Sequence, residues 1–140
     1  MIEVTEKAIS PDGVIAKVQS DGSGCVVTYV GLIRDTSHGR AVLSVEYLDS
    51  ERKAENALRE IAGEAMQRWQ VENIAISHRT GKLIVGETNL VVAVASAHRS
   101  EGFSACQYMI DQFKERLPTL KTETYQNGTL IVEEARRAKE

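Results

Sequence analysis

The sequence predicts an α+β fold, and two observations lead to this class. Stretches with strand and helix patterns are mixed along the chain without strict alternation, and a hairpin is expected near each end. Because a hairpin joins antiparallel strands, an all-parallel sheet is disfavoured. The 140 residues suit a single domain, 1–140, with one core and a polar tail at 134–140.

The N-terminal third is expected to hold three strands and a short helix. Residues 2–8 predict the first strand, and Ser10-Pro11-Asp12 is typical of a helix start, for a helix to about Val18. The apolar run CVVTYVGLI at 25–33 predicts a buried strand. Residues 41–48 are expected to be its hairpin partner, across an exposed loop of suitable length.

A long amphipathic helix and two strands should follow. Ser50 is expected to cap a helix to about Trp69, with apolar residues spaced by three and four. Residues 71–78 predict a strand. After a turn at Thr80-Gly81-Lys82, the strongest strand pattern of the chain covers 88–97.

The C-terminal third predicts a second long helix and a hairpin. Ser100 is expected to cap a helix to about Leu117, which Pro118 ends. Residues 121–125 alternate like a strand, and Asn127-Gly128 is a strong hairpin signal before the return strand. The predicted apolar stripe of this helix consists of Phe103, Cys106, Ile110, Phe113 and Leu117.

Composition argues against several classes of protein. Seventeen basic and twenty acidic residues give a net charge of −3, which disfavours a general nucleic-acid binder. The N-terminus has no signal-peptide pattern, and no apolar stretch is long enough to span a bilayer, so a cytoplasmic location without membrane contact is expected. The two cysteines are expected to be buried thiols, and no metal-ligand spacing, P-loop or GxSxG motif occurs.

Every histidine has an arginine within two positions: His38 with Arg40, His78-Arg79, and His98-Arg99. Each pair can be a surface group paired with acids, or part of an anion site, since arginine binds phosphate and carboxylate with two parallel hydrogen bonds. His98-Arg99 lies just before a predicted helix, whose N-terminus also favours an anion.

Two lysines flank the predicted corner at Pro118. Lys114 should lie at the rim of the apolar stripe, where its stem can pack while the amine reaches water. Alternatively, Lys114 and Lys121 both face one pocket. Arg34 is a further cation, immediately after a predicted strand. Periodicity leaves both interpretations open and slightly favours the first for Lys114.

The order of the motifs resembles the large, catalytic subunit of molybdopterin synthase, the MoaE family. The resemblance covers roughly residues 20–135 and rests on GCVVTYVGLIRD (24–35), VEY (45–47), ISHRTGKLIVGE (76–87), VAVASAHRSEGFSACQYMIDQFKERLPTLKTE (92–123) and the last hairpin. It implies an α/β-hammerhead type of α+β fold. It also implies a sulfurtransferase that converts cyclic pyranopterin monophosphate into molybdopterin without a metal or other cofactor.

The resemblance also implies partners and roles. Sulfur comes from the C-terminal Gly-Gly thiocarboxylate of a small ubiquitin-like subunit, and two large subunits form the central dimer of a heterotetramer. The matching positions make Lys114 and Lys121 catalytic and substrate-binding, and Arg34, His98 and Arg99 substrate-binding, with His98-Arg99 serving the neighbouring protomer.

Several positions depart from the family pattern. Leu120 stands where an aromatic residue is usual, and Thr122 where a basic residue is usual. Leu130 lies near the place of a common tryptophan, and Lys53 that of a methionine. An alternative function follows from the departures near Lys121: a non-catalytic paralogue that binds a Gly-Gly tail or a phosphate ligand.

Overall fold

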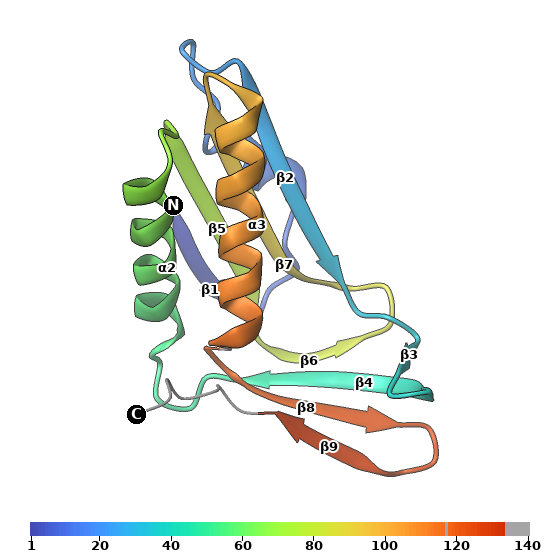
Figure 1. Ribbon diagram of the computed structural model, residues 1–140. Helices are drawn as coiled ribbons and strands as arrows, with labels where there is room; N and C mark the ends of the chain where they lie inside the picture. The colour runs from blue at the N-terminus through green and yellow to red at the C-terminus, as the bar shows by residue number, and fades with distance from the viewer. Residues whose placement is uncertain (117, 134–140) are drawn as a thin grey trace.

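The computed structural model describes residues 1–116 and 118–133. The predicted tail at 134–140 and Leu117, the last residue of the predicted stripe, lie outside the described residues. The chain forms two sheets, with one of its long helices, α3, running down to the place where they meet (Figure 1).

The first sheet has four strands in the order β1 (Ile2–Thr5), β5 (Asn73–Arg79), β7 (Thr88–Ser96) and β2 (Cys25–Leu32). β1 and β5 are parallel, whereas β7 is antiparallel to both of its neighbours. The sheet is therefore mixed. Its central strand β7 is buried from Leu90 to Ser96, which explains the nearly continuous apolar run in the sequence.

Helices cover both faces of this sheet. Leu90, Val92 and Val94 of β7 pack in the cluster beneath α2 (Ala54–Arg68) and α3 (Arg99–Glu115). The alternate residues of β7 pack with Val14 of α1 (Pro11–Ala16) and Val18. This arrangement follows from the two-residue period of a strand, which sends successive side chains to opposite faces.

The second sheet lies across the lower end of the first. β4 (Arg40–Leu48) pairs with β3 (Thr36–Ser37), β6 (Gly81–Ile84) and β8 (Leu120–Tyr125), and β8 pairs with β9 (Leu130–Glu133). All of these pairs are antiparallel. In Figure 1, β4, β8 and β9 cross below the lower ends of β2 and β7.

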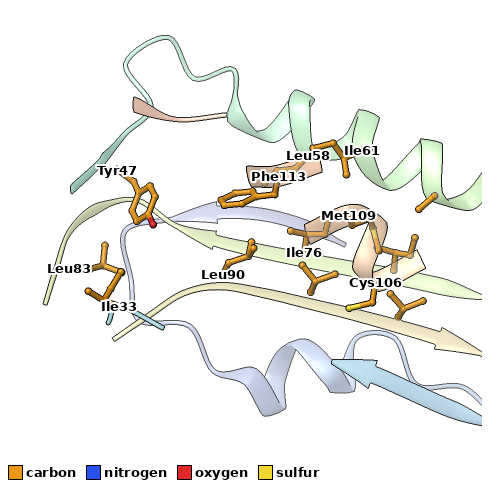
Figure 2. Packing of buried hydrophobic residues seen from close by; sticks show 14 of the residues in the cluster. Ile33, Tyr47, Leu58, Ile61, Ile76, Leu83, Leu90, Cys106, Met109 and Phe113 are labelled. Atoms are coloured by element: carbon orange, nitrogen blue, oxygen red, sulfur yellow. The ribbon is translucent and has the colours of Figure 1, made fainter. Parts of the chain in front are cut away.

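One hydrophobic cluster joins the two sheets and the two long helices. Figure 2 shows Tyr47 of β4 and Leu83 of β6 at one end, and Met109 and Cys106 of α3 farther along. Phe113 lies between them and is only 5% exposed. Because the same cluster includes residues of both sheets, their relative position is fixed by packing and not by a loop alone.

The predicted α+β class, the C-terminal hairpin and the helix from Ser10 are confirmed, and Ser10 accepts a hydrogen bond from the Gly13 amide. The predicted hairpin of 25–33 with 41–48 is wrong. β2 pairs with β7 along its length, while β4 belongs to the other sheet. β7 is buried on both faces and needs a strand at each edge, and β2 satisfies its second edge.

The predicted caps of the two long helices are wrong, however. Asp49, not Ser50, accepts hydrogen bonds from the amides of Lys53 and Ala54 at the start of α2. Helix α3 begins after His98 with no side-chain cap, so Ser100 lies inside its first turn. Phe103, predicted in the buried stripe, is 60% exposed, whereas Ala105 and Met109 are buried in its place.

Within the part of the chain that the structure describes, no helix is both long and apolar enough to cross a membrane.

Candidate functional site

A pocket of about 570 Å³ lies where the C-terminal end of α3 meets the corner between the two sheets. This volume is suitable for a small metabolite or a peptide tail. The lining residues come from β2, β4, β7, β8, β9, α3 and the segment after β2: Tyr29, Leu32, Arg34, Tyr47, Asn89, Phe113, Lys114, Lys121 and Glu133.

Three of the predicted site residues meet here. Lys114 is in the last turn of α3, Lys121 is the second residue of β8, and Arg34 lies two residues after the end of β2. Pro118 lies between α3 and β8, where the chain turns back. The two lysines of the predicted corner therefore face one pocket, which resolves the two interpretations left open by the sequence.

The pocket has a cationic side and a nearby acidic side. None of the three cations forms an ion pair with an acid among the described residues. Glu133 also lines the pocket, and Glu123 lines a smaller adjoining cavity of about 100 Å³ that shares Arg34 and Lys121. The cations are thus available to an anionic ligand, with acidic groups at one border.

The wall behind the cations is a buried aromatic and polar cluster. Tyr47 Oη accepts a hydrogen bond from Asn89 Nδ2 at 3.1 Å, and burial raises the pKa of Tyr47 above its ordinary value. His78 packs edge-on against Tyr47 and Phe113, with ring centroids 5.0 Å and 4.9 Å away. Burial lowers the pKa of His78, so the ring is neutral at neutral pH.

His98 and Arg99 lie elsewhere. They are exposed at the N-terminal end of α3, whereas Lys114 lies at its other end. Fifteen residues of helix at 1.5 Å each separate Arg99 from Lys114 by about 22 Å. Of the five predicted residues, the structure brings together Arg34, Lys114 and Lys121, and leaves His98 and Arg99 outside this pocket.

The other two histidine–arginine pairs have structural partners. His78 is fully buried, and Arg79 donates to Glu87 at 3.0 Å and to the carbonyl of Glu6. His38 is one of the two turn residues between β3 and β4, where its φ is +52°. The surface-pair interpretation therefore holds for Arg79, while His78 belongs to the core.

Tyr47, Asn89 and Glu133 line the pocket but were not predicted from the sequence. Tyr47 could have been predicted from the sequence, because it is an aromatic residue with a polar hydroxyl in the VEY motif on a predicted strand. For Asn89 there was no such signal, since pairing between strands far apart in the sequence places it here. Glu133 had a signal in the predicted C-terminal hairpin, whose register sets it opposite Lys121.

Two other features resemble ligand sites, a cluster of possible cation ligands and a second large cavity. His38, Glu123 and Glu133 place one ligand atom each within 4.8 Å of one another, close enough to hold a cation, but His38 is half-exposed at the turn. A larger cavity of about 750 Å³ between β1, β4 and α2 is lined by Glu6, Glu46, Asp49 and Glu55 against the single cation Arg52. Its acidic lining makes it a poor anion site.

Comparison with known proteins shows which family the chain belongs to. The family described as MoaE protein matches residues 4–116. The molybdopterin synthase catalytic subunit of Thermoplasma volcanium is 36% identical over 127 residues, covering 91% of this chain and 93% of that protein. The structure of molybdopterin synthase from Staphylococcus aureus superposes with a TM-score of 0.86 at 27% identity, covering 94% of this chain and 95% of that one.

A second solved structure shares the fold. It is a protein–protein complex of subunits 1 and 2 of molybdopterin-converting factor from Helicobacter pylori, with a TM-score of 0.74 at 15% identity, covering 96% of this chain and 91% of that one.

The chain belongs to the MoaE family. It is a catalytic subunit of the molybdopterin synthase type, a sulfurtransferase of molybdenum cofactor biosynthesis.

Proposed function

We propose that the pocket at the end of α3 binds two anionic reactants of molybdopterin synthesis. One is cyclic pyranopterin monophosphate, and the other is the C-terminal thiocarboxylate of a small ubiquitin-like subunit. The observation that carries the proposal is the convergence of Arg34, Lys114 and Lys121 on one pocket of a protein with net charge −3. Local positive charge in an acidic protein favours anions at that place.

The chemistry needs charge stabilisation at the tail. The thiocarboxylate sulfur bonds to a carbon of the pterin side chain while a C–O bond at that carbon breaks and its oxygen leaves in protonated form, which gives a thioester between substrate and tail. Water then adds to the thioester carbonyl, and the C–S bond breaks, leaving sulfur on the substrate and a carboxylate on the tail. The tetrahedral intermediate carries an oxyanion, and a fixed ammonium group close to it lowers the barrier.

The cations have different places and hence different roles in this proposal. Lys114, on the last turn of a long helix, acts as the catalytic cation and proton carrier at the reacting carbonyl. Lys121 assists from the facing strand β8, and Arg34 holds the phosphate or the tail carboxylate with its planar guanidinium group.

His98 and Arg99 fit a site shared between protomers. They are too far from Lys114 to serve the same pocket, yet they form an exposed cationic pair at a helix N-terminus. We assign them to the phosphate site of a neighbouring large subunit in a homodimer. Two small subunits complete a heterotetramer in this proposal. The complex of subunits 1 and 2 from Helicobacter pylori, which has the same fold, supports the association with a small subunit.

The experiment is a reconstitution. The chain is mixed with a thiocarboxylated small subunit and cyclic pyranopterin monophosphate, and dithiolene product is measured over time. Lys114→Ala should lower turnover at least 100-fold, roughly the loss expected when an oxyanion-stabilising group is removed. Lys17→Ala is the matched control, because Lys17 lies at the end of α1 on the opposite face of the sheet. Full activity of Lys114→Ala would overturn the assignment.

The same assay distinguishes a second function, a non-catalytic module that binds a Gly-Gly tail or a phosphate ligand. The observation in its favour is the replacement of usual family residues by Leu120 and Thr122. Neither residue lines the pocket or the adjoining cavity, where the lining residues of β8 are Lys121 and Glu123. Binding of the tail by the wild type without any product would favour this module.

A further inference from the structure

We propose that His78 is a positioning residue for the two lysines, acting through a hydrogen bond to Thr119. This inference rests on the proposed function of the pocket and adds a residue to it. His78 itself touches no ligand, because it is fully buried in β5 behind the pocket wall.

The hydrogen bonds of His78 fix its tautomer. Nδ1 lies 2.9 Å from the carbonyl oxygen of Asn89, and a carbonyl can only accept, so Nδ1 carries the proton. Nε2 of the neutral ring is then an acceptor, and it receives the hydroxyl proton of Thr119 at 3.1 Å. Both ring nitrogens are thus satisfied in a site without water exposure.

The partners of His78 all belong to the frame of the pocket. Asn89, Tyr47 and Phe113 line it directly, and the ring of His78 is perpendicular to both aromatic rings at 82°. Phe113 is the residue before Lys114 on α3. His78 therefore contacts the part of the helix from which Lys114 reaches the pocket.

Thr119 completes the connection. It is 3% exposed, follows Pro118, and precedes Lys121 by two residues in the segment that joins α3 to β8. Tyr47 is paired with Lys121 across β4 and β8. The ring of His78 thus joins the end of α3, the corner and the β4–β8 pair, which together determine the distance between the two ammonium groups.

The test uses a pair of substitutions at Thr119 in the complete synthase. Thr119→Val keeps the shape and removes the hydroxyl, leaving Nε2 without a donor, whereas Thr119→Ser keeps the hydroxyl. We expect Thr119→Val to lower kcat about tenfold with little change in KM, because a small misplacement of reacting groups reduces the rate. Thr119→Ser should restore most of kcat.

A structural role alone predicts a different pattern. Ile61→Val in α2 is the control: it lies in the same core on a helix away from the pocket and should lower the melting temperature without lowering kcat. In a Lys121→Ala background, the effect of Thr119→Val should be clearly smaller, since the distance between the two ammonium groups no longer matters once one of them is gone. Equal fold losses in both backgrounds would overturn the proposal.

A second measurement does not depend on turnover. Hydrogen exchange at the amides of Leu120 and Lys121 should be several-fold faster in Thr119→Val than in the wild type, and unchanged in Ile61→Val. Exchange and kcat that both match the wild type would overturn the role of His78. If exchange is faster in Thr119→Val as expected, but the wild-type synthase makes no product, the proposed function is overturned instead.

Discussion

At the scale of single residues, burial decides what a side chain can do. The three histidines look alike in the sequence, each with an arginine close by, yet His78 is fully buried while His38 and His98 are exposed. A buried histidine with both nitrogens hydrogen-bonded is a structural group, and its protonation is opposed by desolvation. The position of a histidine in the fold, and not its neighbour in the sequence, assigns its role.

The lowered pKa of His78 predicts how stability changes with pH. Above the ordinary pKa of 6.5, the ring is neutral in both folded and unfolded chains, so it has no effect. As pH falls below 6.5, the unfolded chain binds a proton that the folded chain does not, and the free energy of unfolding decreases until the lowered pKa is reached.

Urea unfolding at pH 7.5 and pH 5.5 measures this effect, with His78→Gln as the reference. The wild type should lose up to about 1.4 kcal/mol per pH unit more than the variant does over this range. Identical pH dependence of the two proteins would show that His78 does not titrate differently on folding.

At the scale of elements, helix α3 packs closely against the first sheet. It has the predicted pair His98-Arg99 at its N-terminal end and Lys114 in its last turn. Gly102, in its first turns, makes the close approach possible. A Cβ atom there would lie 2.7 Å from Ser96 Oγ and 3.1 Å from Val27 Cγ2. The Ser96 hydroxyl donates to the carbonyl of His98 at 2.7 Å, so it cannot move away without losing that bond.

Two glycine substitutions test this contact. Gly102→Ala should destabilise the protein by about 1–3 kcal/mol through overpacking. Gly63→Ala in α2 is the matched control, because a Cβ at that position meets no atom within 4 Å, and alanine there should stabilise by roughly 0.5–1 kcal/mol. Thermal unfolding of both variants gives the signs, and a neutral Gly102→Ala would contradict the close packing.

At the scale of the whole molecule, the corner between two sheets gathers residues that are far apart in the chain. Arg34 follows the first sheet, whereas Lys121 is part of the second, and α3 carries Lys114 to the junction (Figure 1). The pocket is cationic although the whole chain carries −3. Attraction of an anionic tail should therefore be local and sensitive to screening.

Salt dependence measures this attraction. Raising the ionic strength from 50 to 500 mM should weaken binding of the small subunit's tail, since the screening length falls from more than about 10 Å to less than about 8 Å. Arg34→Ala and Lys121→Ala should each reduce that dependence, whereas Lys17→Ala should leave it unchanged. Calorimetric titration at several salt concentrations provides the slopes.

The sequence by itself determined the α+β class, most of the elements and the residue types of the pocket. The strand pattern at 88–97, the apolar spacing of α2 and the Asn127-Gly128 turn are local patterns. Each depends on residues close in the sequence, so it predicts its element without knowledge of the tertiary structure. For Lys114 and Lys121, periodicity left surface positions and a shared pocket both open, and only the family resemblance favoured the shared pocket.

Only the tertiary structure decided how the strands pair and which cations meet. β2 and 41–48 looked like hairpin partners, but β2 completes the edge of β7, since burial of β7 outweighs the short connection. The separation of His98 and Arg99 from Lys114 follows from helix length. The place of Asn89 in the pocket wall, and of His78 behind that wall, follows from long-range pairing, whose energy lies in contacts that no local pattern contains.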